Sequence, residues 1–240
     1  SVLLLPLVFP LCGSGAGNLT GGIDPAWYLS GRFVPRDNPF FVRLDSLSIP
    51  CDRPHYLRRE AAEALADMYR AFRQARPDVP FRVRSSTRTF DDQTAIWTRK
   101  WNDLCVKRPG ESDRERALDI LRYSSMPGTS RHHWGTDFDL NELVNNYYDR
   151  GHGRTLYLWL VQNAGRFGFF QPYTAGRQRG YAEERWHWSY RPLSVPLKEL
   201  WNDRFRKDPE SMIGAKDFPG AHLAGELAPV YVNTIGEGGS

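Results

Sequence analysis

Two short segments concentrate histidines and carboxylates in this 240-residue chain. Ser130–Asp139 reads SRHHWGTDFD, and Glu184–Trp188 reads ERWHW. Together they can supply two imidazoles, a carboxylate and a spare glutamate. A catalytic zinc site needs three nitrogen or oxygen ligands, an open position for water and a base nearby. If the two segments share one site, the fold must bring together positions 139 and 184, which are 45 residues apart.

The first segment ends in a predicted strand, Thr136–Leu140, in which polar and apolar residues alternate. Successive side chains of a strand point to opposite faces, so Asp137 and Asp139 share one face and the apolar residues share the other. Both carboxylates can then point at a metal held by His132 from the preceding loop. Spacing alone does not choose between the two aspartates.

The second segment leads into another predicted strand, in which Trp186, Trp188 and Tyr190 alternate along one aromatic face. Glu184 and His187 are three positions apart, which would place them on opposite faces of a flat strand. Glu184 is therefore expected in the turn before the strand or at a bulge.

Apolar residues recur at helical spacing after Pro54 as far as Pro77, from Gln93 to Trp101, and over Thr155–Phe167. Phe81–Ser85 alternates like a half-buried strand. Arg88 lies between that strand and the second of these helices, at a junction where loops often present functional side chains. We expect these elements to share one hydrophobic core.

The sequence divides into four predicted segments: an export signal or lipoprotein leader over 1–12, a Gly-rich linker over 13–25, a folded domain over 26–215, and a weakly patterned tail over 216–240. The apolar run 2–11 is followed by Cys12, the residue that is acylated in bacterial lipoproteins. Acylation there would attach the protein to a membrane. Leu11 departs from that pattern, since a small residue is usual, and the alternative for the run is a strand packed on the core. Because the sequence begins with Ser, we expect this leader to be incomplete.

The charge balance is only mildly basic, with 32 Lys and Arg against 28 Asp and Glu. No basic stripe or recognition motif supports a nucleic-acid partner, whereas a slightly basic surface suits an anionic polymer such as a cell wall. The three cysteines, at 12, 51 and 105, lack the paired short spacings of a structural zinc site. Cys51 and Cys105 are either a disulfide or two buried thiols.

The two segments also match a family pattern. Ser130–Asp139 reads S-x-H-x-x-G-x-x-x-D, and Glu184–His187 reads E-x-W-H. In this order the motifs resemble the zinc D-alanyl-D-alanine carboxypeptidases of bacterial cell-wall metabolism, the VanY-like group. Ser85–Thr89 and Pro127–Gly128 fit the same pattern, and the likeness covers roughly residues 57–192.

The resemblance implies three groups of functional residues: the zinc ligands His132, Asp139 and His187; the general base Glu184; and Arg88, which would receive the terminal carboxylate of the substrate, with further substrate contacts from Gln93, Ser130 and Asp137. Asp137 departs from the family pattern, which usually has a small residue there. We keep Asp139 as the ligand and expect Asp137 either to orient a ligand or to contact the substrate.

The resemblance also implies the fold and the reaction. The family fold is α+β, a small antiparallel sheet flanked by helices, shared with hedgehog signalling domains. The expected protein is an exported zinc metallopeptidase, periplasmic or associated with the cell envelope. Its expected partners are peptidoglycan stem peptides, from which it removes the terminal D-alanine, and its oligomeric state stays open.

Three alternatives stay open beside this hypothesis. The first is a D-Ala-D-Ala dipeptidase, and the second is a peptidase that cuts another wall cross-link. The third is a zinc-stabilised binding module without catalysis. Glu184 speaks against the third alternative, because a metal that only supports the fold needs no base.

Overall fold

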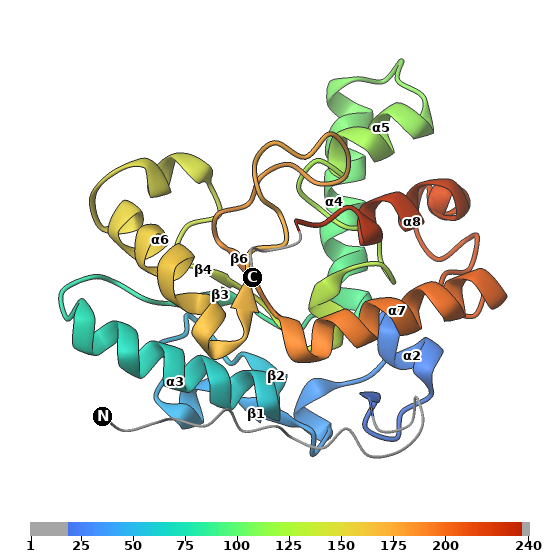
Figure 1. Cartoon of the computed structure of the whole chain (residues 1–240). Coiled ribbons are helices and arrows are strands. Elements are labelled where there is room, and N and C mark those ends of the chain that lie inside the picture. The colour runs from blue at the N-terminus through green and yellow to red at the C-terminus, as the bar shows by residue number, and fades with distance from the viewer. Residues whose placement is uncertain (1–18, 237–240) are drawn as a thin grey trace.

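The structure is a computed structural model and describes residues 19–236. The predicted leader, with Cys12, lies outside the described residues. A small central sheet is flanked by two groups of helices (Figure 1). The α-helices are α2 (Pro25–Ser30), α3 (Arg59–Ala75), α4 (Phe90–Lys107), α5 (Asp113–Ile120), α6 (Gly151–Asn163), α7 (Arg191–Lys207) and α8 (Ala224–Asn233). Short 3₁₀ helices connect them: η1 (Pro35–Asp37), η2 (Leu44–Leu47), η3 (Arg131–Trp134), η4 (Asn145–Asp149), η5 (Ala164–Phe167) and η6 (Ala221–Leu223).

Two antiparallel sheets are present among the described residues. The strands are β1 (Phe41–Arg43), β2 (Tyr56–Arg58), β3 (Val83–Ser85), β4 (Asp137–Leu140), β5 (Phe169–Phe170) and β6 (His187–Tyr190). The central sheet has the order β3-β4-β6-β5, and β1 pairs with β2 alone. The register places Asp139 opposite His187 and Asp137 opposite Ser189, so the two motif segments meet in the middle of the central sheet. The predicted α+β class is confirmed.

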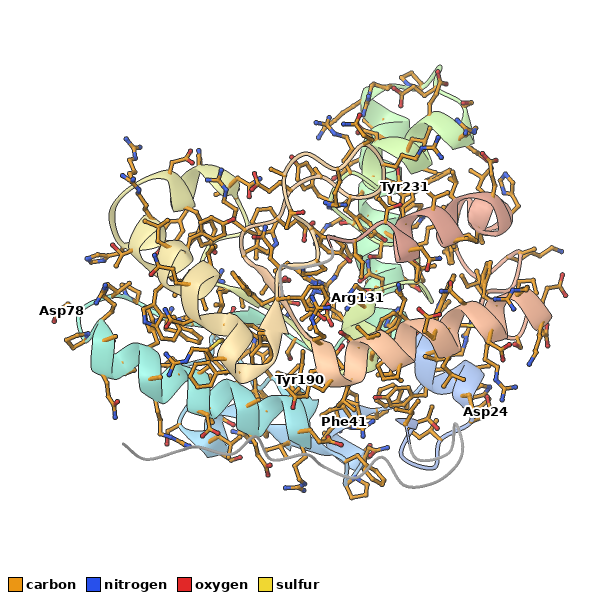
Figure 2. The ribbon with its side chains drawn as sticks, in the orientation of Figure 1. Asp24, Phe41, Asp78, Arg131, Tyr190 and Tyr231 are labelled. Carbon is orange, nitrogen blue, oxygen red and sulfur yellow. The ribbon has the colours of Figure 1, made fainter. Side chains whose placement is uncertain are left out.

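The two faces of the central sheet have different surroundings. Phe138, Leu140 and Trp188 point to one face, where they pack in an apolar cluster with α3 and α6. A second apolar cluster gathers residues of α2, α4, α7 and α8. The opposite face of β4 and β6 is polar, and it lies between the two clusters, where Figure 2 labels Arg131 near the centre of the molecule. The prediction of one core is therefore wrong: the chain has two clusters on either side of a polar layer.

Most of the predicted elements appear close to their expected positions, with one shift near Pro54. There the chain first forms β2, which pairs with β1, and the helix begins only at Arg59. The pairing partner of a three-residue strand is not visible in its own sequence. The helical segment predicted over Thr155–Phe167 continues through η5 and ends at Gly168, which adopts the left-handed conformation with φ of 80°.

The C-terminal segment differs from the predicted weakly patterned tail. It contains η6 and α8, and Leu227 and Val232 are buried in the second cluster. Pro229 lies inside α8, and because proline usually interrupts a helix, the sequence pattern did not predict a helix here. Among residues 19–236, no helix combines the length and apolar character needed to cross a bilayer.

Cys51 and Cys105 are both free thiols. Cys51 packs against the first apolar cluster and Cys105 against the second. Of the two alternatives left open by the sequence, the structure shows separate thiols.

Candidate metal centre

Three buried side chains from three elements converge on the polar face of the sheet. They are His132 of η3, Asp139 of β4 and His187 of β6, and their candidate ligand atoms all lie within 4.8 Å of one another. The sheet register brings the last two together. Ser130 positions the first, because its hydroxyl caps η3 by accepting a hydrogen bond from the His132 backbone N–H at 3.3 Å.

The hydrogen bonding of His132 leaves one ring nitrogen ready for a metal. Its Nδ1 lies 2.8 Å from the carbonyl oxygen of Ser86, so Nδ1 carries the proton and Nε2 holds the lone pair. Within residues 19–236, His132 Nε2 is buried and makes no hydrogen bond, and the buried Asp139 Oδ1 has only the ion-pair contact with His187 Nδ1 at 3.0 Å. Buried polar atoms are nearly always paired. Burial, followed by the charge of Arg88, lowers the pKa of His132 to about 4, which keeps the imidazole neutral as a metal ligand must be. Imidazole and carboxylate donors with orphaned atoms fit Zn²⁺.

Asp137 holds the other ligand histidine in place. Its Oδ2 accepts hydrogen bonds from His187 Nε2 at 2.8 Å and from Arg131 Nε at 2.9 Å. Its Oδ1 accepts from Ser189 Oγ at 2.8 Å and from Thr136 Oγ1 at 2.5 Å. The side chain is fully buried, and its four hydrogen bonds occupy both carboxylate oxygens. Asp137 therefore orients His187, and a contact between Asp137 and the substrate stays a prediction.

The contacts of His187 leave its Nδ1 facing the centre of the cluster. Because Nε2 donates to Asp137, a neutral imidazole would carry its lone pair on Nδ1, which lies 3.0 Å from Asp139 Oδ1. Burial lowers the pKa of His187, but the bonds to Asp137 and Asp139 outweigh it and raise the pKa to about 9. In the absence of a metal, His187 Nδ1 therefore carries a proton. This proton lies between Nδ1 and Asp139 Oδ1 and prevents repulsion between the nitrogen lone pair and the carboxylate oxygen. A divalent cation would take the place of that proton.

Glu184 lies in the turn that precedes β6, as the spacing predicted. Its backbone N–H donates to the carbonyl of Tyr173 at 2.9 Å, and its carbonyl accepts from Gln171 Nε2 at 3.1 Å. These bonds direct the carboxylate to within 3.6 Å of His187 Nδ1. Burial raises the pKa of Glu184 to about 8, the range of a group that exchanges protons near neutral pH. The charge of a bound cation would lower this pKa again.

Arg88 reaches the same centre from the junction between β3 and α4. Its guanidinium donates to Ser85 Oγ at 3.1 Å, to Gln93 Oε1 at 2.8 Å and to Asp139 Oδ2 at 3.4 Å. A guanidinium has five N–H donors, so two are left for a ligand. A capping box of Thr89 with Asp92 begins α4 directly after this arginine and fixes where the junction ends.

Gln93 and Ser130, the two predicted weaker substrate contacts, are both buried beside the centre. Gln93 is fully buried, and its amide bridges Arg88 to the backbone carbonyl of Ser125 at 2.8 Å. Ser130 is buried beneath the cap of η3. In this structure Gln93 positions Arg88 and Ser130 positions His132, and a contact of either residue with the substrate stays a prediction.

One cavity collects the accessible parts of this centre. It has a volume of about 610 Å³, and Arg88, Asp139 and Glu184 line it. Its remaining wall is largely apolar and comprises Ile96, Tyr123, Leu143, Val144 and Trp186, together with Arg99, Lys100 and Asn145. A metal ligand, a candidate base and a cation with free donors thus face one space, which we name the catalytic cavity.

Comparison with known proteins places this arrangement in a family. Residues 54–193 match the family model of VanY, D-alanyl-D-alanine carboxypeptidase. The chain belongs to the VanY family. The matched region contains every residue of the candidate metal centre, from Arg88 to His187.

Individual relatives of the VanY family are distant. The D-alanyl-D-alanine carboxypeptidase of Enterococcus faecalis (strain ATCC 700802 / V583) is 28% identical over 180 residues, which cover 74% of this chain and 63% of that protein. A Bacillus subtilis (strain 168) relative is matched over 60% of its length, so this chain spans about three fifths of these curated relatives. The structure of the LdcB LD-carboxypeptidase is 20% identical, with a TM-score of 0.51 over 74% of this chain and 80% of that chain. This last similarity shows the fold.

Three residues near the VanY-type centre were not predicted from the sequence. Arg131 pairs with Asp137, Lys100 lines the catalytic cavity and donates to Ser124 Oγ at 2.6 Å, and the Ser86 carbonyl fixes His132. Arg131 stands inside the first motif, so its position was a usable signal. The pattern of an amphipathic helix does not distinguish Lys100 from a solvent-exposed lysine. The role of the Ser86 carbonyl cannot be predicted from sequence, because every residue has a backbone carbonyl.

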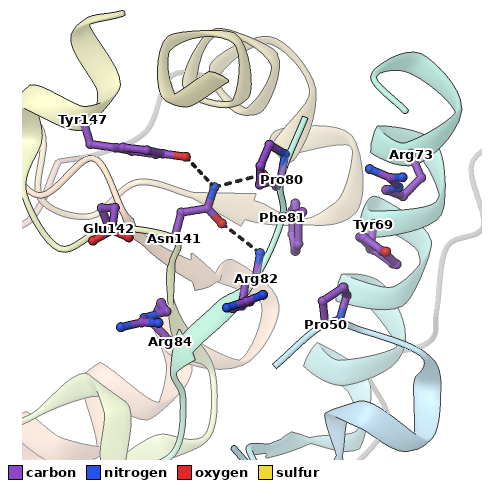
Figure 3. A pocket seen from close by; sticks show the side chains of 10 residues that line it. All are labelled: Pro50, Tyr69, Arg73, Pro80, Phe81, Arg82, Arg84, Asn141, Glu142 and Tyr147. Atoms are coloured by element: carbon purple, nitrogen blue, oxygen red, sulfur yellow. Dashed lines mark hydrogen bonds between the residues drawn. The ribbon is translucent and has the colours of Figure 1, made fainter. Parts of the chain in front are cut away.

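A second cavity of about 510 Å³ lies beside β3, and none of His132, Asp139 and His187 lines it (Figure 3). Asn141 spans it, because its side chain bonds to the Arg82 N–H, the Pro80 carbonyl and the Tyr147 hydroxyl. This cavity includes Glu142 but neither Arg88 nor Glu184. The metal ligand Asp139, the candidate base Glu184 and Arg88 therefore line the catalytic cavity and not this second cavity.

Asp137→Asn is expected to raise the dissociation constant for zinc by about 10- to 100-fold, because an amide orients His187 less well than a carboxylate does. Competition with a chromophoric chelator, on samples shown to be folded by circular dichroism, measures the change. Asp45→Asn, a surface substitution, is the matched control. An unchanged zinc affinity would contradict the positioning role of Asp137.

Proposed function

We propose that this chain is a zinc-dependent D-alanyl-D-alanine carboxypeptidase that removes the terminal D-alanine from peptidoglycan stem peptides. One observation carries the proposal: Arg88, Asp139 and Glu184 line one cavity beside two histidines with ring nitrogens free for a metal. A metallocarboxypeptidase requires three parts in one space: a metal centre, a base, and a group that binds the terminal carboxylate of the substrate.

His132, Asp139 and His187 would hold the zinc ion, which when bound lowers the pKa of a water molecule to about 7 and polarises a carbonyl group. Glu184 takes a proton from the attacking water and passes it to the nitrogen of the leaving alanine. The two free N–H donors of Arg88 hold the terminal carboxylate as a charge-assisted pair. This pairing favours cleavage at a free C-terminus.

The apolar wall of the catalytic cavity suits the acyl part of the substrate. Tyr123, Leu143 and Val144 are about half exposed, at 46%, 48% and 53%. Exposed apolar side chains beside a polar centre are typical of a binding groove. They can pack against the methyl groups of a D-alanyl-D-alanine end and exclude water from the reacting bond.

Two peptides that differ in one group test the proposal. A pentapeptide stem ending in D-Ala-D-Ala is incubated with zinc-loaded protein, and its products are identified by mass spectrometry. Loss of one alanine is expected. The same stem with a C-terminal carboxamide should react about 10- to 100-fold more slowly, since it loses a hydrogen bond to a charged group. An unchanged free-acid stem beside one bound zinc ion per chain would contradict the proposal, and cleavage of the free dipeptide alone would favour a dipeptidase.

We infer that the site of action is outside the cytoplasm, at the cell envelope. Membership of the VanY family and the apolar run 2–11 before Cys12 support this location. A binding module without catalysis is less well supported, because such a module needs neither Glu184 nor a cavity around it.

A further inference from the structure

The catalytic cavity does not end at Arg88. A third cavity, of about 600 Å³, begins on the other side of this residue and shares Arg88, Ile96 and Arg99 with the catalytic cavity. Its other lining residues come from η1, the segment 53–56, the loop 86–89 and α4. We name it the leaving-side cavity, for the reason given below.

One face of α4 forms a wall common to both cavities. Asp92, Ala95, Ile96 and Arg99 follow each other at the three- and four-residue spacing that places side chains on one side of a helix. The last two also line the catalytic cavity. Helix α4 therefore forms a continuous wall that runs from the catalytic cavity past Arg88 into the leaving-side cavity.

The leaving-side cavity is strongly basic. Four arginines line it against a single carboxylate: Arg36, Arg53, Arg88 and Arg99 against Asp92. The carboxylate is occupied, because it accepts hydrogen bonds from the N–H and hydroxyl of Thr89 at 2.9 and 2.8 Å. Within residues 19–236, no acidic side chain lies within salt-bridge distance of Arg53 or Arg99. Arg36 lies 3.5 Å from the exposed Asp37, and Arg88 lies 3.4 Å from Asp139. Arg53 and Arg99 therefore carry positive charge without an acidic partner, and such charge attracts anionic ligands.

The position of this cavity relative to the reaction rests on the proposed function. If Arg88 holds the carboxylate of the leaving residue, the scissile bond lies toward Asp139 and Glu184, which line only the catalytic cavity. The acyl part of the substrate then occupies the catalytic cavity. The space beyond Arg88 lies on the side of the leaving group. A single alanine does not need it.

We propose that the leaving-side cavity binds the remainder of a larger leaving group, so that this protein also hydrolyses cross-linked stem peptides. The substrate class is a dimer in which the carbonyl of D-alanine is joined to the side-chain amino group of a diamino diacid. The carbon that bears this amino group also bears a carboxylate, as in a terminal D-alanine. Arg88 can therefore hold both kinds of leaving group, and further carboxylates of the leaving stem meet Arg36, Arg53 and Arg99.

The same bonds form and break whether the substrate is the linear pentapeptide or the cross-linked dimer. The oxygen of water bonds to the carbonyl carbon of the acyl D-alanine, and the carbon–nitrogen bond breaks. One proton of the water passes through Glu184 to the leaving nitrogen. The products are a stem that ends in a D-alanine carboxylate and a second stem with a free amino group.

The test compares the linear pentapeptide with the cross-linked dimer, on zinc-loaded full-length protein, as a ratio of kcat/KM values. In Arg36→Gln/Arg53→Gln, the ratio of dimer to pentapeptide should fall about 5- to 10-fold, mainly through KM on the dimer, and the difference should shrink at high salt. Arg82→Gln/Arg84→Gln, which also removes two positive charges but at the cavity beside β3, should leave the ratio unchanged. A dimer linked through the side chain of lysine, which lacks the carboxylate on the carbon next to the leaving nitrogen, should be a poorer substrate than the diamino diacid dimer.

The outcomes separate this inference from the proposed function. Hydrolysis of the pentapeptide with an intact dimer overturns the inference alone, as does a ratio that the double substitution leaves unchanged. Equal rates on the two dimers overturn the role of Arg88 in holding the leaving stem. Failure on both linear and cross-linked peptides overturns the proposed function, and the inference with it.

Discussion

Glu184→Gln is expected to lower kcat for stem-peptide hydrolysis by about 10²- to 10⁴-fold, the usual contribution of a general base. The amide keeps the shape of the carboxylate but cannot accept a proton from water. Glu184 is 3.6 Å from His187 Nδ1 and is held by backbone bonds to Tyr173 and Gln171, so the substitution should leave the turn in place. Zinc binding should be retained, because the three ligand atoms come from other residues.

Single-turnover kinetics with mass spectrometry measure the rate, and chelator competition measures the zinc affinity on the same sample. Glu183→Gln is the matched control, because this neighbouring carboxylate pairs with Arg185 at 3.1 Å and does not line the catalytic cavity. A kcat close to that of the unmodified protein would mean that another group is the base. Loss of zinc together with activity would mean that Glu184 is a ligand.

The parts of the site that the sequence predicted are those that depend on local pattern. Alternation over Thr136–Leu140 correctly placed Asp137 and Asp139 on one face of β4. The three-residue spacing of Glu184 and His187 correctly required a turn before β6. The long-range step, which brings these segments together, came from the resemblance to a family, since periodicity does not reveal which strands pair.

The parts that the sequence did not predict depend on packing. Gln93 and Ser130 are polar residues inside or beside functional motifs, yet helix and 3₁₀ packing bury both and turn them toward other protein groups. The same holds for Asp137, whose four hydrogen-bond donors are Arg131 of η3, Thr136 directly before β4, and His187 and Ser189 of β6. Burial of a polar side chain is stable only when its partners are in place, and those partners lie far away in the sequence.

Arg131 is the partner that makes the burial of Asp137 possible. Its guanidinium is nearly inaccessible, donates to Asp137 and to Ser189 Oγ at 2.6 Å, and lies over the rings of Trp134 and Phe170. Burial raises the pKa of the Asp137 carboxyl, but the Arg131 charge and the bond from His187 hold it well below its usual range. The two charges thus cancel within the polar layer.

Arg131→Met should therefore lower the free energy of unfolding by about 3–5 kcal/mol, since it leaves a buried carboxylate without its cation. Urea denaturation of the zinc-free protein measures this change. Arg108→Met, which breaks a surface pair with Asp119, is the control and should have no measurable effect. Replacing both partners, in Arg131→Met/Asp137→Ala, should recover much of the stability, because no buried charge is left unpaired.

The double variant separates stability from metal binding. Without Asp137, nothing holds the His187 ring by its Nε2, so zinc affinity should stay weak although the fold is restored. If Asp137 served only as the buried partner of Arg131, stability and zinc affinity would recover together in Arg131→Met/Asp137→Ala. Recovery of stability without recovery of zinc affinity would show that Asp137 is the means by which the chain aims His187 at the metal.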